Sequence, residues 1–157
     1  MNKEYLLDAN IVIKIWNEYP KLLDMMEKTH EIDYKIPQDI AGELAVKEFK
    51  NINGVPVLTD KFLKLLGHII NNDGSNFEND DEKNSYNNFD YNNYFFKTNK
   101  ISINDYTLIH ICEKHKKYTL VTEDKRILQS AENVLDPSRV LNFNGFIEEL
   151  KEYNVIK

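Results

Sequence analysis

Short apolar runs and segments with helical spacing alternate along the chain. The run at residues 5–7 predicts a buried strand that ends at Asp8, and the apolar positions that resume at Ile11 predict a helix. By the same criteria the predicted strands are 5–7, 34–36, 118–122 and 140–143. The predicted helices follow Asp8, open at Pro20, span 38–49 and 59–70, begin at Ser102 and span 144–153. Strands separated by helices predict an α/β protein with three layers, α/β/α, around a central parallel sheet.

Residues 71–100 interrupt this alternation with many Asn, Asp, Ser and Gly residues. Aromatic residues gather in the second half of this segment. A connection of this length without regular structure is uncommon inside a compact domain. We therefore expect this Asn-rich insert to be mobile in its first half and to form one or two helical turns later.

Composition limits the class of protein. The 157 residues, 41% of them hydrophobic, can bury one core, and we interpret residues 1–157 as a single domain. The net charge of -6 excludes a strongly basic protein that binds nucleic acid by bulk attraction, although local basic patches or bound cations could still hold a polyanion. The single cysteine, Cys112, cannot form an internal disulfide, and no segment resembles a secretion signal or reaches the roughly 20 apolar residues that cross a bilayer. These features indicate a soluble cytoplasmic protein without a membrane partner.

Two acidic residues directly follow predicted buried strands. Asp8 follows the first strand and Asp124 follows the strand at 118–122, so both are expected at the carboxyl edge of the sheet, where ligands of such sheets bind. Each residue could instead cap the helix that comes next, because Asp is a favoured N-cap residue. For either residue taken alone, both interpretations stay open.

Two further acids, Asp105 and Glu43, lie on predicted helices. Residues 102–105 have the spacing of a capping box, which would explain Asp105 by itself. At about 100° per residue, however, Asp105 falls on the side of the helix that carries Leu108 and Cys112. An ionised carboxylate there needs a metal ion, another cation or a shared proton nearby. Glu43 lies away from the centre of the apolar side of its helix, so it could be merely solvated.

The order and spacing of these acids resemble those of the PIN domain family. The resemblance rests on short motifs that together span nearly the whole chain: Leu6-Leu7-Asp8-Ala9-Asn10, Glu43 on an early helix, Asn104-Asp105-Tyr106-Thr107-Leu108-Ile109, and Val121-Thr122-Glu123-Asp124. It implies a doubly wound parallel sheet and an endoribonuclease that hydrolyses RNA phosphodiester bonds with Mg²⁺ or Mn²⁺. It also implies that Asp8, Glu43, Asp105 and Asp124 are the metal-binding and catalytic acids.

The resemblance further implies partners. Many members of the family are the toxin of a bacterial type II toxin–antitoxin pair, so a protein antitoxin is considered beside the RNA substrate. A homodimer is considered as well, because apolar residues over 59–70 could form its surface, although packing in the core explains them equally well. The insert at 71–100 departs from the compact toxin pattern, which affects the toxin assignment more than the nuclease assignment.

A carboxylate cluster of this kind has a definite chemistry. Several carboxylates within a few ångströms repel one another, and divalent cations that prefer oxygen ligands keep them ionised together. A bound metal would lower the pKa of a water molecule for attack on the phosphodiester. Lys125 and Arg126 are the nearest cations in sequence for the RNA phosphates, and Asn10 and Thr122 are expected to orient the acids or water. The four histidines lack the spacing of a zinc site, and Cys112 is expected in the core.

Two other functions fit the same residues. Asp8 could attack phosphorus directly in a phosphohydrolase, because Asp8-Ala9-Asn10 is close to an Asp-x-Asp motif, although Asn10 argues against this. Alternatively, the protein could be a non-catalytic PIN-like module that binds RNA or a protein through the insert. Formation of an aspartyl-phosphate would identify the first function, and absence of cleavage would favour the second.

Overall fold

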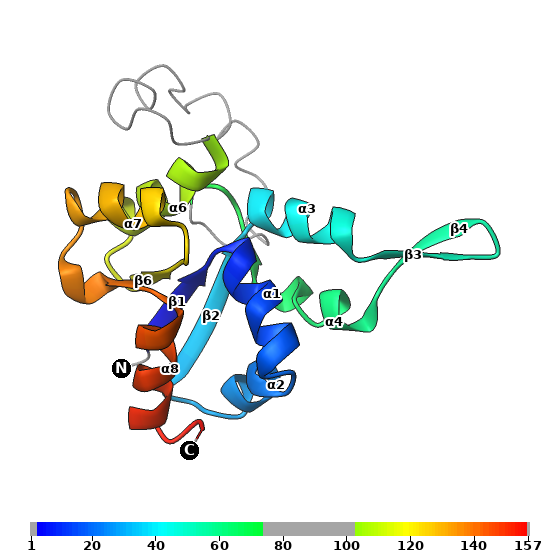
Figure 1. The fold of residues 1–157 in the computed structure, drawn as a ribbon, viewed down its shortest axis with the longest axis horizontal. Helices are drawn as coiled ribbons and strands as arrows, with labels where there is room; N and C mark the ends of the chain where they lie inside the picture. The colour runs from blue at the N-terminus through cyan, green and yellow to red at the C-terminus, as the bar shows by residue number, and fades with distance from the viewer. Residues whose placement is uncertain (1–2, 74–102, 157) are drawn as a thin grey trace.

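Five parallel strands form the central sheet of the computed structural model, which describes residues 3–73 and 103–156 (Figure 1). The side chains of residues 49, 50, 58 and 103–105 lie outside this description. The strands of this sheet are β1 Lys3–Leu7, β2 Ile32–Pro37, β5 Ile69–Ile70, β6 Tyr118–Val121 and β7 Val140–Leu141. They lie in the order β5-β2-β1-β6-β7, and every neighbouring pair is parallel. The predicted α/β class and the central parallel sheet are confirmed.

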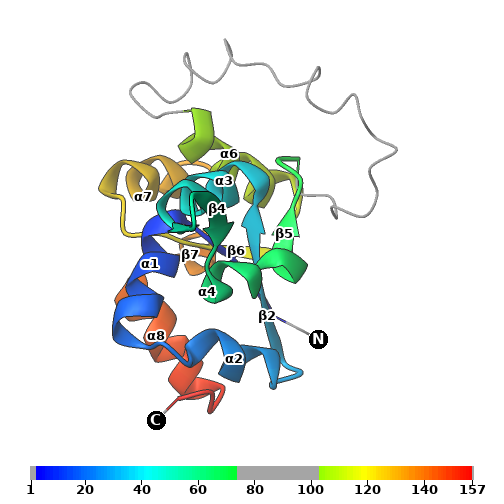
Figure 2. The same cartoon turned by 90° about the vertical axis from the view of Figure 1, so that its right-hand side faces the viewer.

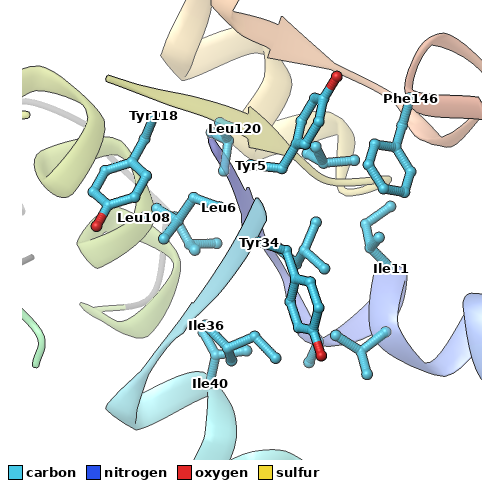
Figure 3. Close-up of a cluster of buried hydrophobic side chains, with 14 of the residues drawn as sticks. Tyr5, Leu6, Ile11, Tyr34, Ile36, Ile40, Leu108, Tyr118, Leu120 and Phe146 are labelled. Atoms are coloured by element: carbon cyan, nitrogen blue, oxygen red, sulfur yellow. The ribbon is translucent and has the colours of Figure 1, made fainter. Parts of the chain in front are cut away.

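Helices cover both faces of this sheet. The α-helices are α1 Ala9–Glu18, α2 Leu22–Glu27, α3 Gln38–Lys47, α4 Asp60–Leu63, α6 Ile103–Lys114, α7 Lys125–Glu132 and α8 Phe143–Glu152, and the 3-10 helices are η1 Leu66–His68 and η3 Pro137–Arg139. Successive residues of β1 turn to opposite sides, Leu6 toward Leu108 of α6 and Tyr5 toward Phe146 of α8 (Figure 3). The rings of Tyr5 and Phe146 meet edge to face, with centroids 5.0 Å apart. The three-layer arrangement follows from this alternation.

Among the described residues, three tyrosines on the strands of the sheet are fully buried: Tyr5, Tyr34 and Tyr118. The Tyr5 hydroxyl donates to Glu149 Oε1 at 2.7 Å, and the Tyr34 hydroxyl lies 3.5 Å from Glu27 Oε1. Within the described residues, the Tyr118 hydroxyl has no hydrogen-bond partner. Burial raises the pKa of Tyr118 above its ordinary value, so the hydroxyl stays neutral and its desolvation is uncompensated.

We expect Tyr118→Phe to raise the free energy of unfolding by about 1 kcal/mol, because it removes a buried polar group that lacks a partner. Tyr5→Phe is the matched control. It should lower the free energy of unfolding by about 1 kcal/mol, because it breaks the hydrogen bond to Glu149. Urea unfolding of both variants measures the difference, and a Tyr118→Phe protein less stable than the wild type would contradict the expectation.

A separate two-stranded sheet follows α3. β3 Phe49–Ile52 and β4 Val55–Leu58 form an antiparallel hairpin around Asn53 and Gly54, whose φ angles are 54° and 82°. Two positive φ values are typical of a type I′ turn, for which Asn-Gly is a preferred sequence. The hairpin extends away from the central sheet (Figure 1). The helix predicted over 38–49 is therefore wrong at its end, because α3 stops at Lys47 and Phe49 begins a strand.

The helix predicted over 59–70 is wrong beyond its first turn. α4 is a single turn, and the chain continues through η1 into β5. Phe62, Leu65 and Ile70 are buried, as their spacing suggested, but Ile70 pairs with Pro37 of β2. Gly67 weakens a continuous helix here. Apolar spacing alone does not distinguish a helix from a short buried strand.

The end of the last predicted strand and the start of the last helix differ from the prediction. The strand predicted over 140–143 is shorter, because the Asn142 side chain accepts from Gly145 N at 2.8 Å and caps α8, which begins at Phe143.

From residue 74 onward the Asn-rich insert lies outside the described residues, as does Ser102. Within the described ranges, the helices are too short or too polar to span a membrane.

Candidate functional site

The carboxyl edge of the sheet contains a point where the winding of the chain reverses. From β1 the chain moves outward to β2 and β5, and it then returns to β6 on the other side of β1. The connections after β1 and β6 therefore lead to opposite faces, and open parallel sheets bind ligands at such a switch point. Figure 2 shows α3 and α6 at this edge and α2 at the opposite one. Asp8 and Asp124 follow the two strands that meet at the switch point.

Asp8 is almost fully buried, with 5% of its surface exposed. Its backbone N–H donates to Val121 O at 3.1 Å, which continues the pairing of β1 with β6. Oδ1 of its carboxylate accepts from Ala9 N at 2.7 Å, so Asp8 caps α1. Oδ2 accepts from Thr122 Oγ1 at 2.6 Å. The capping interpretation of Asp8 is confirmed, and the neighbouring strand end supplies a second hydrogen bond that capping does not require.

Thr122 joins the two strand ends through its buried hydroxyl. Its Oγ1 donates to Asp8 and accepts from the backbone N–H of Asp124 at 3.1 Å. Asp124 caps α7, because its Oδ1 accepts from Arg126 N at 2.8 Å and from Ile127 N at 3.4 Å. Both capping bonds use Oδ1, so Oδ2 of this half-buried carboxylate is the oxygen that could reach a ligand. Thr122 thus orients Asp8, as its place in the sequence suggested.

Glu123 is part of this edge, although its position in the sequence predicted no role for it. Its carboxylate accepts from Lys14 Nζ at 3.0 Å and from Phe143 N at 3.1 Å, and its own N–H donates to Asn10 Oδ1 at 3.3 Å. The N–H of Phe143 and then the Lys14 ammonium hold the pKa of Glu123 below its usual range, so it stays ionised. Glu123 therefore ties the loop after β6 to α1 and α8. Asn10, expected to orient the acids, bonds to this loop instead.

Glu43 lies on α3, which begins directly after β2 at the same edge of the sheet. Ile40, Ala41 and Leu44 form the buried side of this helix, and the Glu43 side chain is exposed. Burial therefore gives Glu43 no support of the kind that it gives Asp8.

Asp105 lies in the first turn of α6, and its side chain is outside the described part of the structure. Because α6 leads back into the start of β6, its first turn belongs to the carboxyl edge. The apolar side of this helix is less distinct than the sequence suggested. Buried residues surround α6 and do not form one stripe: Tyr106, Thr107, Leu108, Ile109, Ile111 and Cys112. Most positions on α6 are therefore next to buried residues, and such a position does not by itself distinguish Asp105.

Burial or local contacts explain two other potentially reactive side chains, Cys112 and His68. Cys112 is fully buried, as expected, and burial raises its pKa to about 12, which leaves an unreactive neutral thiol. His68 Nε2 lies 2.8 Å from Glu27 Oε1, and its ring stacks on Tyr34 with centroids 3.8 Å apart. Among the side chains that the structure describes, no group of three or more His, Cys, Asp or Glu is placed to hold a metal ion. The Asp105 side chain is not part of that set.

At the switch point the buried Thr122 hydroxyl thus links the Asp8 carboxylate to the backbone N–H of Asp124, beside the ion pair of Glu123 with Lys14. Exposed Lys125 and Arg126 follow in the first turn of α7. Comparisons of the chain with protein-family models, with curated proteins and with solved structures found no match.

Proposed function

We propose that this protein is a metal-dependent endoribonuclease of the PIN type, which hydrolyses RNA phosphodiester bonds with Mg²⁺ or Mn²⁺. The observation that carries the proposal is the hydrogen-bonded bridge from Asp8 through Thr122 to Asp124 at the switch point of a parallel sheet. In this proposal Asp8, Glu43, Asp105 and Asp124 are the acids that bind the metal.

Asp8 is the central residue of the proposed site. The N–H of Ala9, the positive end of α1 and the Thr122 hydroxyl all direct partial positive charge at its carboxylate. Carboxylate oxygens are the ligands that Mg²⁺ and Mn²⁺ prefer, so this donor chemistry fits either ion. When bound, the cation would supply a water of lowered pKa and positive charge beside the phosphate.

The chain's own residues would position the substrate. Thr122 fixes Asp8 relative to the loop that carries Asp124. Lys125 and Arg126 are exposed next to Asp124, where cations attract phosphate oxygens. Such local cations are compatible with an overall net charge of -6.

The alternative to a metal ligand at Asp8 is an aspartate nucleophile. An attacking carboxylate directs a lone pair at phosphorus and becomes covalently phosphorylated, whereas a metal ligand does not. Both oxygens of Asp8 already accept one hydrogen bond, so a metal ion or a phosphorus atom would each use a remaining lone pair, and the covalent product separates the two mechanisms. Mass-spectrometric detection of phosphorylated Asp8 after incubation with a phosphate ester would contradict the nuclease mechanism.

The test is cleavage of RNA by the full chain, with mixed single-stranded and structured RNAs as substrates. We expect cleavage with Mg²⁺ or Mn²⁺ and none after chelation with EDTA. Asp124→Asn should lower the cleavage rate about ten-fold, because it removes a charge near the metal and keeps the helix cap.

Asp136→Asn is the matched control. Asp136 caps η3 by accepting from Ser138 N at 2.9 Å, which is the same local role, but it precedes β7 at the amino edge of the sheet. This variant should cleave at the wild-type rate. An equal loss of activity in both variants, or no cleavage by the wild type with either metal, would count against the proposed function.

A further inference from the structure

The β3–β4 hairpin is a sheet of only two strands. It is not hydrogen-bonded to the central sheet, and it projects beyond α3 and α4 (Figure 1). An isolated two-stranded hairpin is marginally stable in water, and three or more strands are usually needed. The hairpin therefore gains stability from any strand that adds to its edge.

Exposed apolar side chains concentrate on this hairpin and at its base. Of the exposed large apolar residues in the described part of the chain, most fall between residues 46 and 66: Val46, Ile52, Val55, Val57, Leu63 and Leu66. Ile52 and Val55, which flank the turn, are 54% and 58% exposed. Monomeric soluble proteins rarely leave large apolar patches in contact with water, and such patches commonly mark interfaces.

The turn determines which backbone groups of the hairpin face outward. In a two-residue hairpin the residues that flank the turn form a hydrogen-bonded pair, and such pairs alternate with pairs that are not hydrogen-bonded. Ile52–Val55 is therefore a hydrogen-bonded pair, and the next such pair beyond the strands is Glu48–Thr59. Thr59 N does donate to Glu48 O at 3.1 Å. The N–H and C=O of Asn51, and the C=O of Pro56 opposite it, consequently point away from the hairpin.

The two edges of the hairpin are not equivalent. Pro56 has no N–H, so the outer edge of β4 lacks a donor at its centre, a common way to protect an edge strand. The outer edge of β3 keeps both groups of Asn51. Any added strand therefore pairs with β3.

We infer that a second copy of this chain pairs with β3, in an antiparallel arrangement centred on Asn51. The two Asn51 residues would exchange both N–H···O bonds across a two-fold axis, which gives a four-stranded sheet in the order β4-β3-β3-β4. Centring on Lys50 would place like charges directly opposite each other, which is unfavourable. A two-fold pairing needs no other partner, because the same edge supplies the donor and the acceptor.

The apolar side chains support this arrangement. Ile52 and Val55 are opposite each other, and Val57 is two residues from Val55, so these three side chains share one face of the hairpin. Pairing through β3 places the same face of both copies side by side. By register Lys50 lies on this face too, opposite Val57 of its own hairpin and opposite Ile52 of the other copy, so each row across the four strands holds three apolar residues and one lysine. This inference does not depend on the proposed nuclease activity.

The test is sedimentation velocity of the full chain from low micromolar to a few hundred micromolar. The wild type should be a dimer. Asn51→Pro removes the outward N–H as Pro56 does on β4, and Ile52→Lys places a second positive charge directly opposite Lys50 of the other copy; each should raise the dimer dissociation constant at least ten-fold. Val134→Lys, at a residue that is 48% exposed elsewhere in the chain, is the matched control and should remain dimeric.

Hydrogen exchange gives a second measurement that a general loss of folding would not mimic. The Asn51 amide should exchange more slowly as the wild-type concentration rises, whereas amides of the central sheet should not change. A wild type that is monomeric over this range would overturn the inference. So would a dimer that persists in both Asn51→Pro and Ile52→Lys.

Discussion

Asp8→Asn is expected to lower RNA cleavage about a thousand-fold and to leave the protein folded. Asn caps helices as well as Asp does, so the bond from the N–H of Ala9 is preserved. The Thr122 hydroxyl, which donates to Asp8, can rotate and accept from the new amide. The substitution therefore removes only the negative charge, which is the property that a metal site requires and a cap does not.

Measurement of stability on the same variant separates the two interpretations of Asp8. Replacing a buried charge by a neutral amide should leave the free energy of unfolding unchanged or raise it by about 1 kcal/mol. Asp8→Ala loses the cap and should be about 1 kcal/mol less stable than the wild type. Urea unfolding and cleavage of a fluorescent RNA are measured on the same preparations. An Asp8→Asn protein that cleaves at the wild-type rate would show that Asp8 only caps α1.

The strands that carry the candidate site were predictable because their signals are local. Residues 5–7 and 118–121 are buried on both faces of a parallel sheet, and such strands appear in the sequence as uninterrupted apolar runs. Asp8 and Asp124 follow these runs directly, so their place at the carboxyl edge needed only the parallel topology. Their capping roles were equally predictable from residue type.

The contacts that join the site were less predictable because they depend on register. The hydrogen bond between Thr122 and Asp8 links residues that are 114 positions apart. The sequence indicates two strand ends but not that β1 and β6 are neighbours, and a different strand order would separate these side chains. Glu123 was missed for the same reason, since its partners Lys14 and Phe143 come from the two helices that flank it only in the folded chain.

The hairpin and β5 were missed for different reasons. Asn53-Gly54 is the strongest short signal of a hairpin, but Asn is so frequent in this chain that the dipeptide did not stand out. β5 has only two residues, and no periodicity can be read from so short a segment. The prediction that Asp105 falls on the one apolar side of α6 failed for another reason, because this helix is buried on most sides and has no single apolar face.

Arg139→Met is expected to lower the free energy of unfolding by about 3 kcal/mol, because the guanidinium satisfies several backbone carbonyls at once. Its Nη2 donates to Cys112 O at 2.7 Å, to Tyr118 O at 2.8 Å and to His115 O at 3.2 Å, and its Nε donates to Tyr118 O at 3.2 Å. The last carbonyls of a helix have no partner within the helix. Arg139 therefore closes the C-terminal end of α6 and holds the loop that leads into β6.

The choice of substitutions isolates the guanidinium. Met keeps most of the apolar stem of Arg139, so the loss reports the hydrogen bonds more than the packing. Arg139→Lys should recover less than half of the loss, because one ammonium lacks the planar fork that reaches three carbonyls. Lys116→Met, at an exposed lysine in the loop between α6 and β6, is the control and should stay within about 0.5 kcal/mol of the wild type.

The position of Arg139 also separates stability from activity. Its carbonyl partners lie where α6 ends and β6 begins, at the amino edge of the sheet, whereas Asp8 and Asp124 lie at the carboxyl edge. Arg139→Met should therefore unfold at lower urea concentrations, yet cleave RNA at the wild-type rate under conditions where it is folded. A variant as stable as the wild type would contradict the role of the guanidinium. A folded variant with reduced cleavage would instead show that the two edges of the sheet are coupled.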